Sequence, residues 1–408
     1  MIDTRKIAQD FPMLKKMVNG KRLVFLDSAS TTLKPQSVID GVVEYLTETT
    51  SNSHRGDYQT AYEVDVRVDE TRDAVARFIN AEKDEIVFTS GTSMSINLVA
   101  YGYGIKHLNK NDEILITQAE HASNVLPWFK VSEHTGAKVN YIPLDEEGRL
   151  TADNLRKVIS HKTKIVAVAH VTNVMGFLID LKQIAAIAHE FGALIVVDGA
   201  QSVPHFATDV KDLDIDFLSF SGHKMLGPTG IGVLFGKYHL LQAMEPLMMG
   251  GGMSARFDMC GDIDLMLPPV KFEAGTLNLE GVFGLKKAIE YLEDLGMSNI
   301  VAHEDKLRAY AISELKKLDN VIIYNEKAEA GIITLNLKGV FAQDASTYFN
   351  SKGIAVRSGQ HCAKILTDFL KTHATIRMSM YVYTTKEDID LFVDACKKGG
   401  DFLDVYFE

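Results

Sequence analysis

Two residues of this sequence, Lys224 and Asp198, have the types and surroundings that chemistry on an amino group would need. Lys224 follows Ser221, Gly222 and His223 in SFSGHKMLG, between two short apolar runs. A lysine stripped of water becomes a nucleophile that can form a Schiff base, although a surface lysine on a loop explains the segment about equally well. Asp198 ends the apolar run ALIVVD, where it could hold the protonated nitrogen of a heterocycle or cap a helix. The pair together favours the chemical roles.

A third segment, SGTSMSIN, offers a binding site for an anion such as a phosphate. Gly91 permits a tight turn, and Thr92 and Ser93 supply hydroxyl and backbone N–H groups at the start of a helix. Ordinary helix capping explains the same residues equally well. Ser221 and His223 would add two further donors from the lysine segment.

The combination of these residues favours pyridoxal phosphate as the ligand. Its phosphate, ring nitrogen and aldehyde need an anion site, a carboxylate and a lysine, and Asp198 and Lys224 would supply the last two. His121, in QAEHASN, could lie flat against such a ring. A lone histidine is more often a hydrogen-bonded part of the structure, so only its neighbours favour the stacking role.

Cys362, in GIAVRSGQHCAKIL, is one of three cysteines and poses a separate question. Cys260 and Cys396 lie far from it and no C-x-x-C pair exists, which argues against a zinc site or a disulfide framework. No metal site is predicted. Taken alone, the segment fits a buried, packing cysteine best. If the thiol reacts, Arg357 and His361 are the neighbouring residues that could act as cations and raise its thiolate fraction.

The elements that must position these residues form an alternating pattern. Short apolar runs without polar alternation are separated by helical patterns, which is typical of a mostly parallel β-sheet buried between helices. Ligand sites in such sheets lie at the carboxyl ends of the strands. The runs expected to be strands are 86–92, 113–121, 164–173, 193–201, 216–224 and 230–236.

The pattern changes after about Gly284. Residues 284–318 predict long helices, and short strands and helices follow. The last helix is expected in TTKEDIDLFVDACKK, where a threonine cap and early acidic residues would start it. This part of the chain predicts a smaller α+β domain.

Length and composition limit the class of protein. A chain of 408 residues exceeds one typical core and predicts two domains, or one large α/β domain with an appendage, and 46% apolar residues fit an ordinary globular protein. The net charge of −11 argues against nucleic-acid binding. The first residues do not resemble a signal peptide and no apolar run is long enough to span a membrane, so the expected location is the cytoplasm.

Several motifs, in order along the chain, resemble those of class V aminotransferases among the fold-type I pyridoxal-phosphate enzymes. More narrowly, the sequence resembles the group II (SufS-like) cysteine desulfurases and selenocysteine lyases. The motifs are FLDSAS (25–30), SHRGDY (53–58), HVTNVMG (170–176), VVDGAQS (196–202), SFSGHKMLGPTGIG (219–232), FEAGT (272–276) and RSGQHCA (357–363). Departures from the family pattern occur at Ser90, Met94, Ser95, Ser123 and Gln360, and none removes a residue with a direct chemical role.

The resemblance implies an α/β fold of the fold-type I aminotransferase kind. A large domain (20–285) would bind pyridoxal phosphate and contain a mostly parallel, seven-stranded sheet flanked by helices. A smaller C-terminal α+β domain (286–408) would include the N-terminal segment (1–19).

The resemblance also implies roles for individual residues. Lys224 is expected to form the Schiff base, His121 to stack on the ring and Cys362 to take the sulfur. The expected cofactor contacts are Thr92, Ser93, His121, Asn173, Asp198, Gln201, Ser221, His223 and Lys224, with Thr276 reaching the phosphate of the neighbouring subunit in a homodimer. The expected substrate contacts are Arg377, Arg357, Asn173, His54 and Arg55.

The activity implied is conversion of L-cysteine to L-alanine, with the sulfur left on Cys362 as a persulfide. A sulfur-acceptor protein of an iron–sulfur cluster assembly pathway would then collect it. Selenocysteine is an alternative substrate, and an aminotransferase or β-lyase is an alternative enzyme that would not need Cys362. A nucleotide-binding protein ranks low because no G-x-G-x-x-G or G-x-x-x-x-G-K-[ST] motif is present. A non-catalytic scaffold ranks low because Lys224 and Asp198 are intact.

Overall fold

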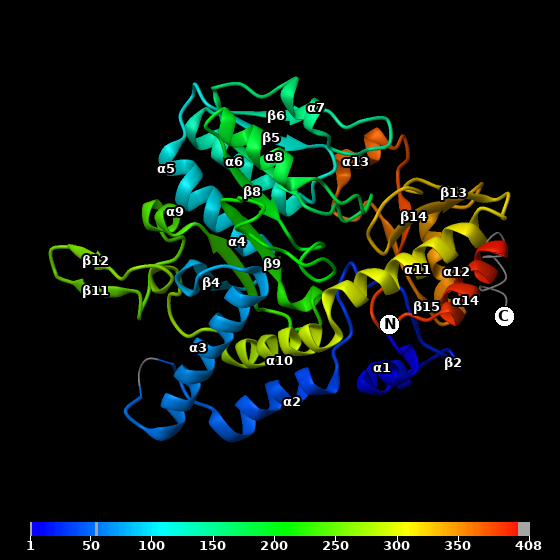
Figure 1. Ribbon diagram of the computed structural model, residues 1–408, viewed down its shortest axis with the longest axis horizontal. Coiled ribbons are helices and arrows are strands. Elements are labelled where there is room, and N and C mark those ends of the chain that lie inside the picture. The colour runs from blue at the N-terminus through cyan, green and yellow to red at the C-terminus, as the bar shows by residue number, and fades with distance from the viewer. Residues whose placement is uncertain (1, 54–55, 399–408) are drawn as a thin grey trace.

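A seven-stranded β-sheet forms the centre of the protein in the computed structural model, which describes residues 2–53 and 56–398 (Figure 1). The strand order is β4-β10-β9-β8-β7-β5-β6. Strand β10 runs antiparallel to its neighbours β4 and β9, and the other neighbouring pairs are parallel. The predicted mostly parallel sheet is therefore confirmed. The strands are β4 Ile86–Thr89, β5 Glu113–Thr117, β6 Lys138–Ile142, β7 Thr163–Ala169, β8 Leu194–Asp198, β9 Phe217–Ser221 and β10 Gly232–Gly236.

Helices cover both faces of this sheet. Alternate residues of its central strands point to opposite sides, and those on each side are apolar and need cover. In β8, Ile195 and Val197 pack into one buried cluster together with α8, whereas Val196 packs into another with Trp128 of α6. Asp180 starts α8 by accepting the backbone N–H of Gln183. The helices around this sheet are α3 Gln59–Ile79, α4 Thr92–Val99, α5 Ile105–His107, α6 Leu126–Thr135, α7 Ala152–Arg156, α8 Leu181–Glu190, α9 Tyr238–Ala243 and α10 Leu279–Leu295.

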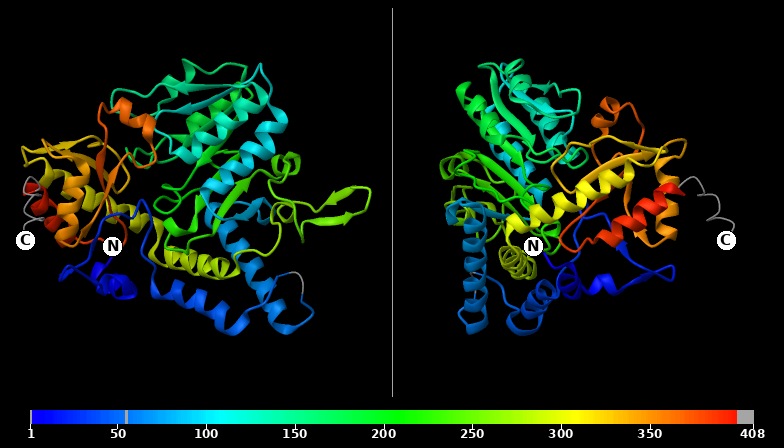
Figure 2. Two further views of the ribbon diagram at one scale, coloured as in Figure 1. Left: turned by 180° about the vertical axis from the view of Figure 1, so that it is seen from behind. Right: turned by 45° about the vertical axis from the view of Figure 1, so that its right-hand side comes forward.

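A second, four-stranded antiparallel sheet lies beside the first, with the order β13-β14-β17-β16 (Figures 1 and 2). The helices at 297–315, 342–351 and 386–397 pack on it around a separate buried cluster, whereas the helix at 364–369 packs in another cluster with Ala119 and Phe177. This part confirms the predicted α+β character of the C-terminal region, whereas the domain boundaries stay a prediction. The elements are β13 Val321–Ile323, β14 Ile332–Leu337, β16 Arg357–Gly359, β17 Thr375–Ser379, α11 Met297–Leu315, α12 Ala342–Ser351, α13 Lys364–Phe369 and α14 Lys386–Lys397.

The N-terminal segment crosses to this second part of the molecule. Strand β3 (Val24–Phe25) pairs in parallel with β15 (Ile354–Ala355), so residues from the two ends of the chain lie side by side. The residues that follow β3 then pass between the two sheets toward α2. The remaining elements are α1 Thr4–Asp10, α2 Gln36–Glu44, β1 Met17–Val18, β2 Lys21–Arg22, β11 Ser254–Phe257 and β12 Ile263–Leu265.

Some strands of the structure were not among those expected from sequence, including the short strands β1, β2 and β3. Strand β6 at the sheet edge is another, and its residues alternate between exposed and partly buried positions up to Ile142, which is buried. The β11–β12 hairpin, which extends away from the body of the molecule, was also not expected (Figures 1 and 2). In the part of the chain that the structure describes, no helix is long and apolar enough to cross a membrane.

A buried ion pair between Arg72 of α3 and Glu273 offers a test of the fold. Its two N–H···O hydrogen bonds are both 2.8 Å long, and Glu273 also accepts the backbone N–H of Phe88. We expect Glu273→Ala to lower the free energy of unfolding by about 3–5 kcal/mol, because it strands a buried cation. Urea denaturation measures the free energy of unfolding. Glu293→Ala, which breaks the exposed pair to Arg77, is the control and should change that free energy by less than about 0.5 kcal/mol. A loss below about 1 kcal/mol for Glu273→Ala would contradict the argument.

Candidate active site

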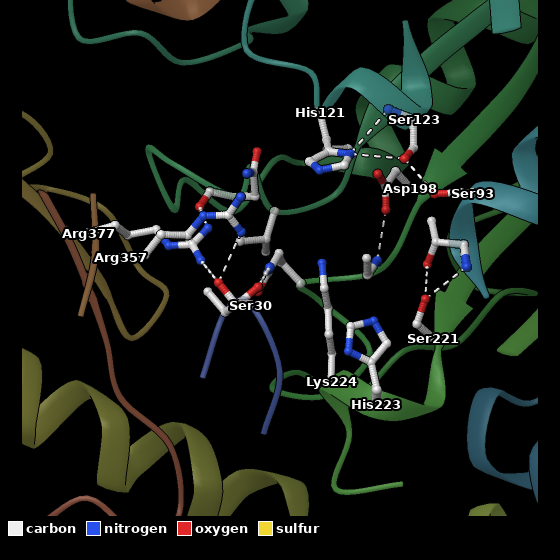
Figure 3. Close-up of a pocket in the computed structure, with 17 residues that line it drawn as sticks. Ser30, Ser93, His121, Ser123, Asp198, Ser221, His223, Lys224, Arg357 and Arg377 are labelled. Carbon is white, nitrogen blue, oxygen red and sulfur yellow. Dashed lines mark hydrogen bonds between the residues drawn. The ribbon is translucent and has the colours of Figure 1, made fainter. Parts of the chain in front are cut away.

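One cavity lies at the carboxyl ends of β8 and β9 and faces strands β16 and β17 of the second sheet (Figure 3). This is the edge of the sheet at which the sequence predicts a ligand site. We call it the central cavity. The predicted site residues that line it are Thr92, Ser93, His121, Asn173, Asp198, Gln201, Ser221, His223, Lys224, Arg357 and Arg377.

One end of the central cavity is the N-terminus of α4. Gly91 precedes the helix with φ of +146°, a conformation that favours glycine. The Ser221 hydroxyl lies 2.8 Å from both the backbone nitrogen and the hydroxyl of Thr92, which joins β9 to this helix. Ser93 is exposed and its hydroxyl lies 2.6 Å from that of Ser123. The result is a group of N–H and O–H donors at a helix N-terminus, which suits an anion.

Asp198 and Lys224 form the centre of the cavity. Asp198 is the last residue of β8 and is 6% exposed, and its Oδ1 accepts the backbone N–H of Ala200 at 2.9 Å. Burial raises the pKa of this carboxyl, although the nearby Lys224 acts in the opposite direction. Lys224 ends the short turn Gly222–Lys224 that follows β9. Loss of water lowers the pKa of its amine to about 8, with Asp198 opposing this change.

The lowered pKa of Lys224 predicts how its reactivity depends on pH. A protonated amine does not react with acylating reagents, so labelling of Lys224 by acetic anhydride in the cofactor-free protein should rise with pH and level off above about pH 8. An ordinary lysine amine has a pKa of roughly 10.4 and keeps gaining reactivity beyond that point. Peptide mass spectrometry separates the sites, and the exposed lysines of the same sample serve as controls. Labelling of Lys224 that still climbed steeply between about pH 9 and pH 10 would contradict the assignment.

His121 lies on the wall of the cavity opposite Lys224 (Figure 3). Its Nδ1 accepts the backbone N–H of Ser123 at 3.1 Å, so the proton of the neutral ring sits on Nε2. Burial and the nearby cations, Lys224 first, lower its pKa to about 4. Directly before it, Glu120 is buried and accepts the backbone N–H of Ala169, which ties the histidine segment to β7.

Two arginines from neighbouring strands form the opposite end of the cavity. Arg357 of β16 and Arg377 of β17 are directly paired across the strands. Arg377 is 1% exposed, donates to the backbone oxygen of Asn173 at 2.9 Å, and has Asp27 as its carboxylate neighbour at 3.2 Å. Burial lowers its pKa to about 10. Ser30 accepts hydrogen bonds from both arginines. Two positive charges beside one partly exposed carboxylate favour binding of a further anion.

Cys362 is exposed, so the interpretation of its segment as a buried cysteine is wrong. Both His361 and Cys362 have positive φ, 52° and 57°, which turns the thiol outward. The loop is held by hydrogen bonds from the backbone of Ala122 to the Cys362 oxygen and from the Asn173 amide to the His361 oxygen. Arg357 Nη2 lies 3.6 Å from the Cys362 sulfur. A cation at this position favours the nucleophilic thiolate.

His361 does not act as the second cation that its position in the sequence suggested. Its ring is buried, and Nε2 donates to the backbone oxygen of Thr375 at 3.1 Å. Burial and the two arginines lower the pKa of His361 to about 3, so the ring is neutral. Of the two candidates, only Arg357 contacts the thiol.

Some predicted residues do not meet at this cavity, and some residues of the site were not predicted. Thr276 is exposed and does not line it. His54 and Arg55 lie outside the described residues. Ser30 and Asp27 were not assigned a role, although both belong to the motif FLDSAS that follows a short apolar run.

The sequence profile of the class-V aminotransferase family matches residues 24–392. The chain belongs to this family. It is 44% identical over 405 residues to a "Probable cysteine desulfurase" of Halalkalibacterium halodurans, covering 98% of this chain and 99% of the relative. The predicted family membership is therefore confirmed.

Two solved structures of this family superpose on the whole chain. The cysteine desulfurase CsdA of Escherichia coli, in an S-sulfonic acid form, has a TM-score of 0.92 and 36% identity, covering 98% of this chain and 99% of that one. An apo cysteine desulfurase of Thermococcus onnurineus has a TM-score of 0.92 and 35% identity, covering 98% of each chain. These similarities confirm the predicted fold-type I aminotransferase-like fold.

Proposed function

We propose that this family member is a cysteine desulfurase that uses pyridoxal phosphate, converts L-cysteine to L-alanine and takes the sulfur onto Cys362 as a persulfide. The observation that carries the proposal is the exposed sulfur of Cys362, 3.6 Å from Arg357, beside a cavity that also holds Lys224 and Asp198. An aminotransferase or β-lyase would need the cavity but not the exposed thiol. The named relatives are consistent with this function.

The donors of the central cavity fit pyridoxal phosphate. A Cβ at Gly91 would lie 3.1 Å from the Ser221 hydroxyl, so glycine keeps the N-terminus of α4 open for a phosphate. Thr92, Ser93, Ser221 and His223 would hold that phosphate. Asp198 would face the ring nitrogen, and Asn173 and Gln201 would contact the ring hydroxyl or the substrate. When bound, the cofactor supplies an electron sink for charge that develops at the α-carbon of the substrate.

Lys224 would hold the cofactor covalently and move the α-proton of the substrate. Because its pKa lies near 8, much of the amine is neutral at mildly alkaline pH and can accept a proton. His121 would lie against the ring. Its Nε2–H can donate a hydrogen bond inside the cavity, because the lowered pKa keeps the ring neutral.

The arginine pair would bind the carboxylate of the amino-acid substrate. Guanidinium groups match a carboxylate with two parallel hydrogen bonds, and Arg377 Nε has no partner among the described residues. Arg357, which contacts both Ser30 and the Cys362 sulfur, would place the substrate near the thiol.

Cys362 would attack the sulfur of the substrate as a thiolate. A sulfur–sulfur bond forms while the bond between the substrate sulfur and its β-carbon breaks. The electron pair of the broken bond stays on the β-carbon, which takes up a proton and becomes the methyl group of alanine. Thiolate, cysteine and one proton therefore give a persulfide and alanine, without any external oxidant or reductant.

Incubation of the purified protein with pyridoxal phosphate and cysteine tests the proposal. We expect an absorption band at about 420 nm that borohydride removes, which is typical of the cofactor bound to a lysine amine. We also expect alanine and persulfide on Cys362 in equal amounts in the first turnover. The absence of the band, or alanine formed without sulfur on Cys362, would overturn it.

The proposal extends to assembly and partners. Thr276 is exposed away from the central cavity of its own chain, which supports a homodimer in which it reaches the cofactor phosphate of the other subunit. Exposed apolar residues on the β11–β12 hairpin, Phe257 and Ile263, also support burial against a second copy. Sulfur on an exposed thiol can pass to an acceptor protein of iron–sulfur cluster assembly, in a reducing compartment such as the cytoplasm.

A further inference from the structure

The backbone oxygen of His223 is surrounded by four donors from one short segment. It accepts the backbone N–H of Thr32 at 3.0 Å, the hydroxyls of Thr31 and Thr32, each at 3.1 Å, and the amine of Lys34 at 3.0 Å. A carbonyl oxygen has two lone pairs and needs only one or two donors. The peptide bond between His223 and Lys224 is planar, so these contacts also fix the position of the Lys224 backbone.

The turn that carries Lys224 needs support of this kind. It is a single turn of three residues, Gly222–Lys224, and Leu226 shortly after it has φ of +68°. Short turns of this type have poorer hydrogen-bond geometry than an α-helix and contribute little stability by themselves. The Thr32 hydroxyl also accepts the backbone N–H of Leu226, two residues beyond the turn, at 3.0 Å.

Lys34 is an unusual residue to find in this place. Its amine donates to the backbone oxygens of Thr32, at 2.6 Å, and His223, and it has no carboxylate partner among the ion pairs of the described residues. Burial lowers its pKa to about 7. A lysine that gives up water without gaining a counter-charge lowers stability unless its hydrogen bonds compensate for the loss.

The other end of the same segment contacts the arginine pair. The Ser30 hydroxyl donates to Asp27 at 2.7 Å and accepts hydrogen bonds from Arg377 at 2.7 Å and Arg357 at 3.1 Å. Ser30 is the direct neighbour of Thr31. Residues 27–34 therefore contact both the arginine pair and the peptide bond that precedes Lys224.

We propose that Asp27–Lys34 sets the distance between the arginine pair and the amine of Lys224, with Lys34 as the positioning residue at the lysine end. The inference rests on the proposed function, in which the arginines hold the substrate carboxylate and Lys224 takes the α-proton. The α-carbon is one bond from the carboxylate, so this distance decides whether the amine reaches the proton. A small displacement slows proton transfer strongly while leaving substrate binding almost unchanged.

The first test compares Lys34→Met with Lys34→Arg in the protein loaded with pyridoxal phosphate. We expect Lys34→Met to lower kcat for alanine formation by about 10- to 100-fold and to change KM for cysteine by less than about threefold. Lys34→Arg, which keeps a cation and its donors, should recover most of kcat. Thr31→Val removes one donor to the same oxygen and should lower kcat less than Lys34→Met does.

Lys271→Met is the matched control, because the amine of Lys271 likewise donates to two backbone oxygens, those of Gln242 and Met244, and Lys271 is even more fully buried than the partly buried Lys34. It should lower the melting temperature but not kcat. If Lys34→Met lowers kcat no more than Lys271→Met does, or if Lys34→Arg recovers none of the lost rate, the inference is overturned.

The second test needs no cofactor and so separates the inference from the proposed function. Acetylation of Lys224 in the cofactor-free protein, followed by peptide mass spectrometry, reports how firmly its amine is held. We expect labelling to become several-fold faster in Lys34→Met, and to stay at the unmodified rate in Lys34→Arg and Lys271→Met. Equal labelling of Lys224 in all four proteins would overturn the inference. Absence of the cofactor band in the unmodified protein would overturn the proposed function alone.

Discussion

Replacing Lys224 with alanine is expected to remove the absorption band at about 420 nm and to slow alanine formation by at least about 10⁴-fold. Two losses combine in this variant. The covalent attachment of the cofactor disappears, and the amine that moves the α-proton is absent. Proton transfer by a positioned group alone contributes roughly 10²- to 10⁴-fold. Absorption spectra and a coupled assay for alanine measure the two effects separately.

Two further measurements distinguish the chemical role of Lys224 from a structural one. Lys224→Arg keeps a cation beside Asp198 but should lose the band and the activity as fully as the alanine variant. Added methylamine should restore part of the rate to Lys224→Ala, because a small amine can enter the space left by the side chain and accept the proton. A Lys224→Ala protein that kept the band, or formed alanine at an undiminished rate, would contradict the proposed function.

The central part of the fold could be predicted because its physical signal is local. Strands β7 and β8 each contain a continuous apolar run, 165–169 and 194–197, as expected where both faces of a strand are covered by helices. Strand β6 carries no such signal, because an edge strand with one exposed face can contain Lys138 and Asn140. Strand β3 has only two residues and depends on pairing with β15 from the far end of the chain.

The site was predictable to the extent that its residues end predicted strands. Asp198 and Ser221 are the last residues of β8 and β9, so the sheet itself brings them together. The neighbours of Cys362 were harder to predict, because they depend on the positive φ of His361 and Cys362 and on contacts with distant residues. The state of His361 also depends on distant residues. Its proximity to Cys362 in the sequence suggested a cation beside the thiol, whereas burial against Thr375 keeps its ring neutral.

The contribution of Ser30 could not be read from the sequence. The motif FLDSAS marks where a short run ends, but the hydrogen bonds from Arg357 and Arg377 to Ser30 join residues more than three hundred positions apart. Only the folded chain brings these side chains together. The hydrogen bond from Lys34 to the His223 backbone oxygen likewise forms only in the folded chain.

Replacing Cys362 with alanine should have a different signature from the loss of Lys224. The absorption band should persist, because Cys362 does not line the cavity that holds Lys224 and Asp198. Alanine formation from cysteine should fall by at least about 10²-fold, since the nucleophile that receives the sulfur is gone. A selenium atom departs more readily, so activity on selenocysteine should be reduced less. Spectra and alanine assays with both substrates measure these effects.

The other two cysteines provide the controls that make the Cys362 result specific. Cys260 is exposed, so Cys362→Ala, which keeps Cys260, shows whether another accessible thiol suffices, and Cys260→Ala shows whether Cys260 is needed at all. Cys396 is buried in the core of the second sheet, and burial raises its pKa well above the usual value, so Cys396→Ala should affect stability alone. Both variants should form alanine at the unmodified rate and carry the added sulfur on the Cys362 peptide. Desulfuration at the normal rate in Cys362→Ala would show that the sulfur leaves by another route, and the arrangement of Arg357 beside an exposed thiol would then need a different explanation.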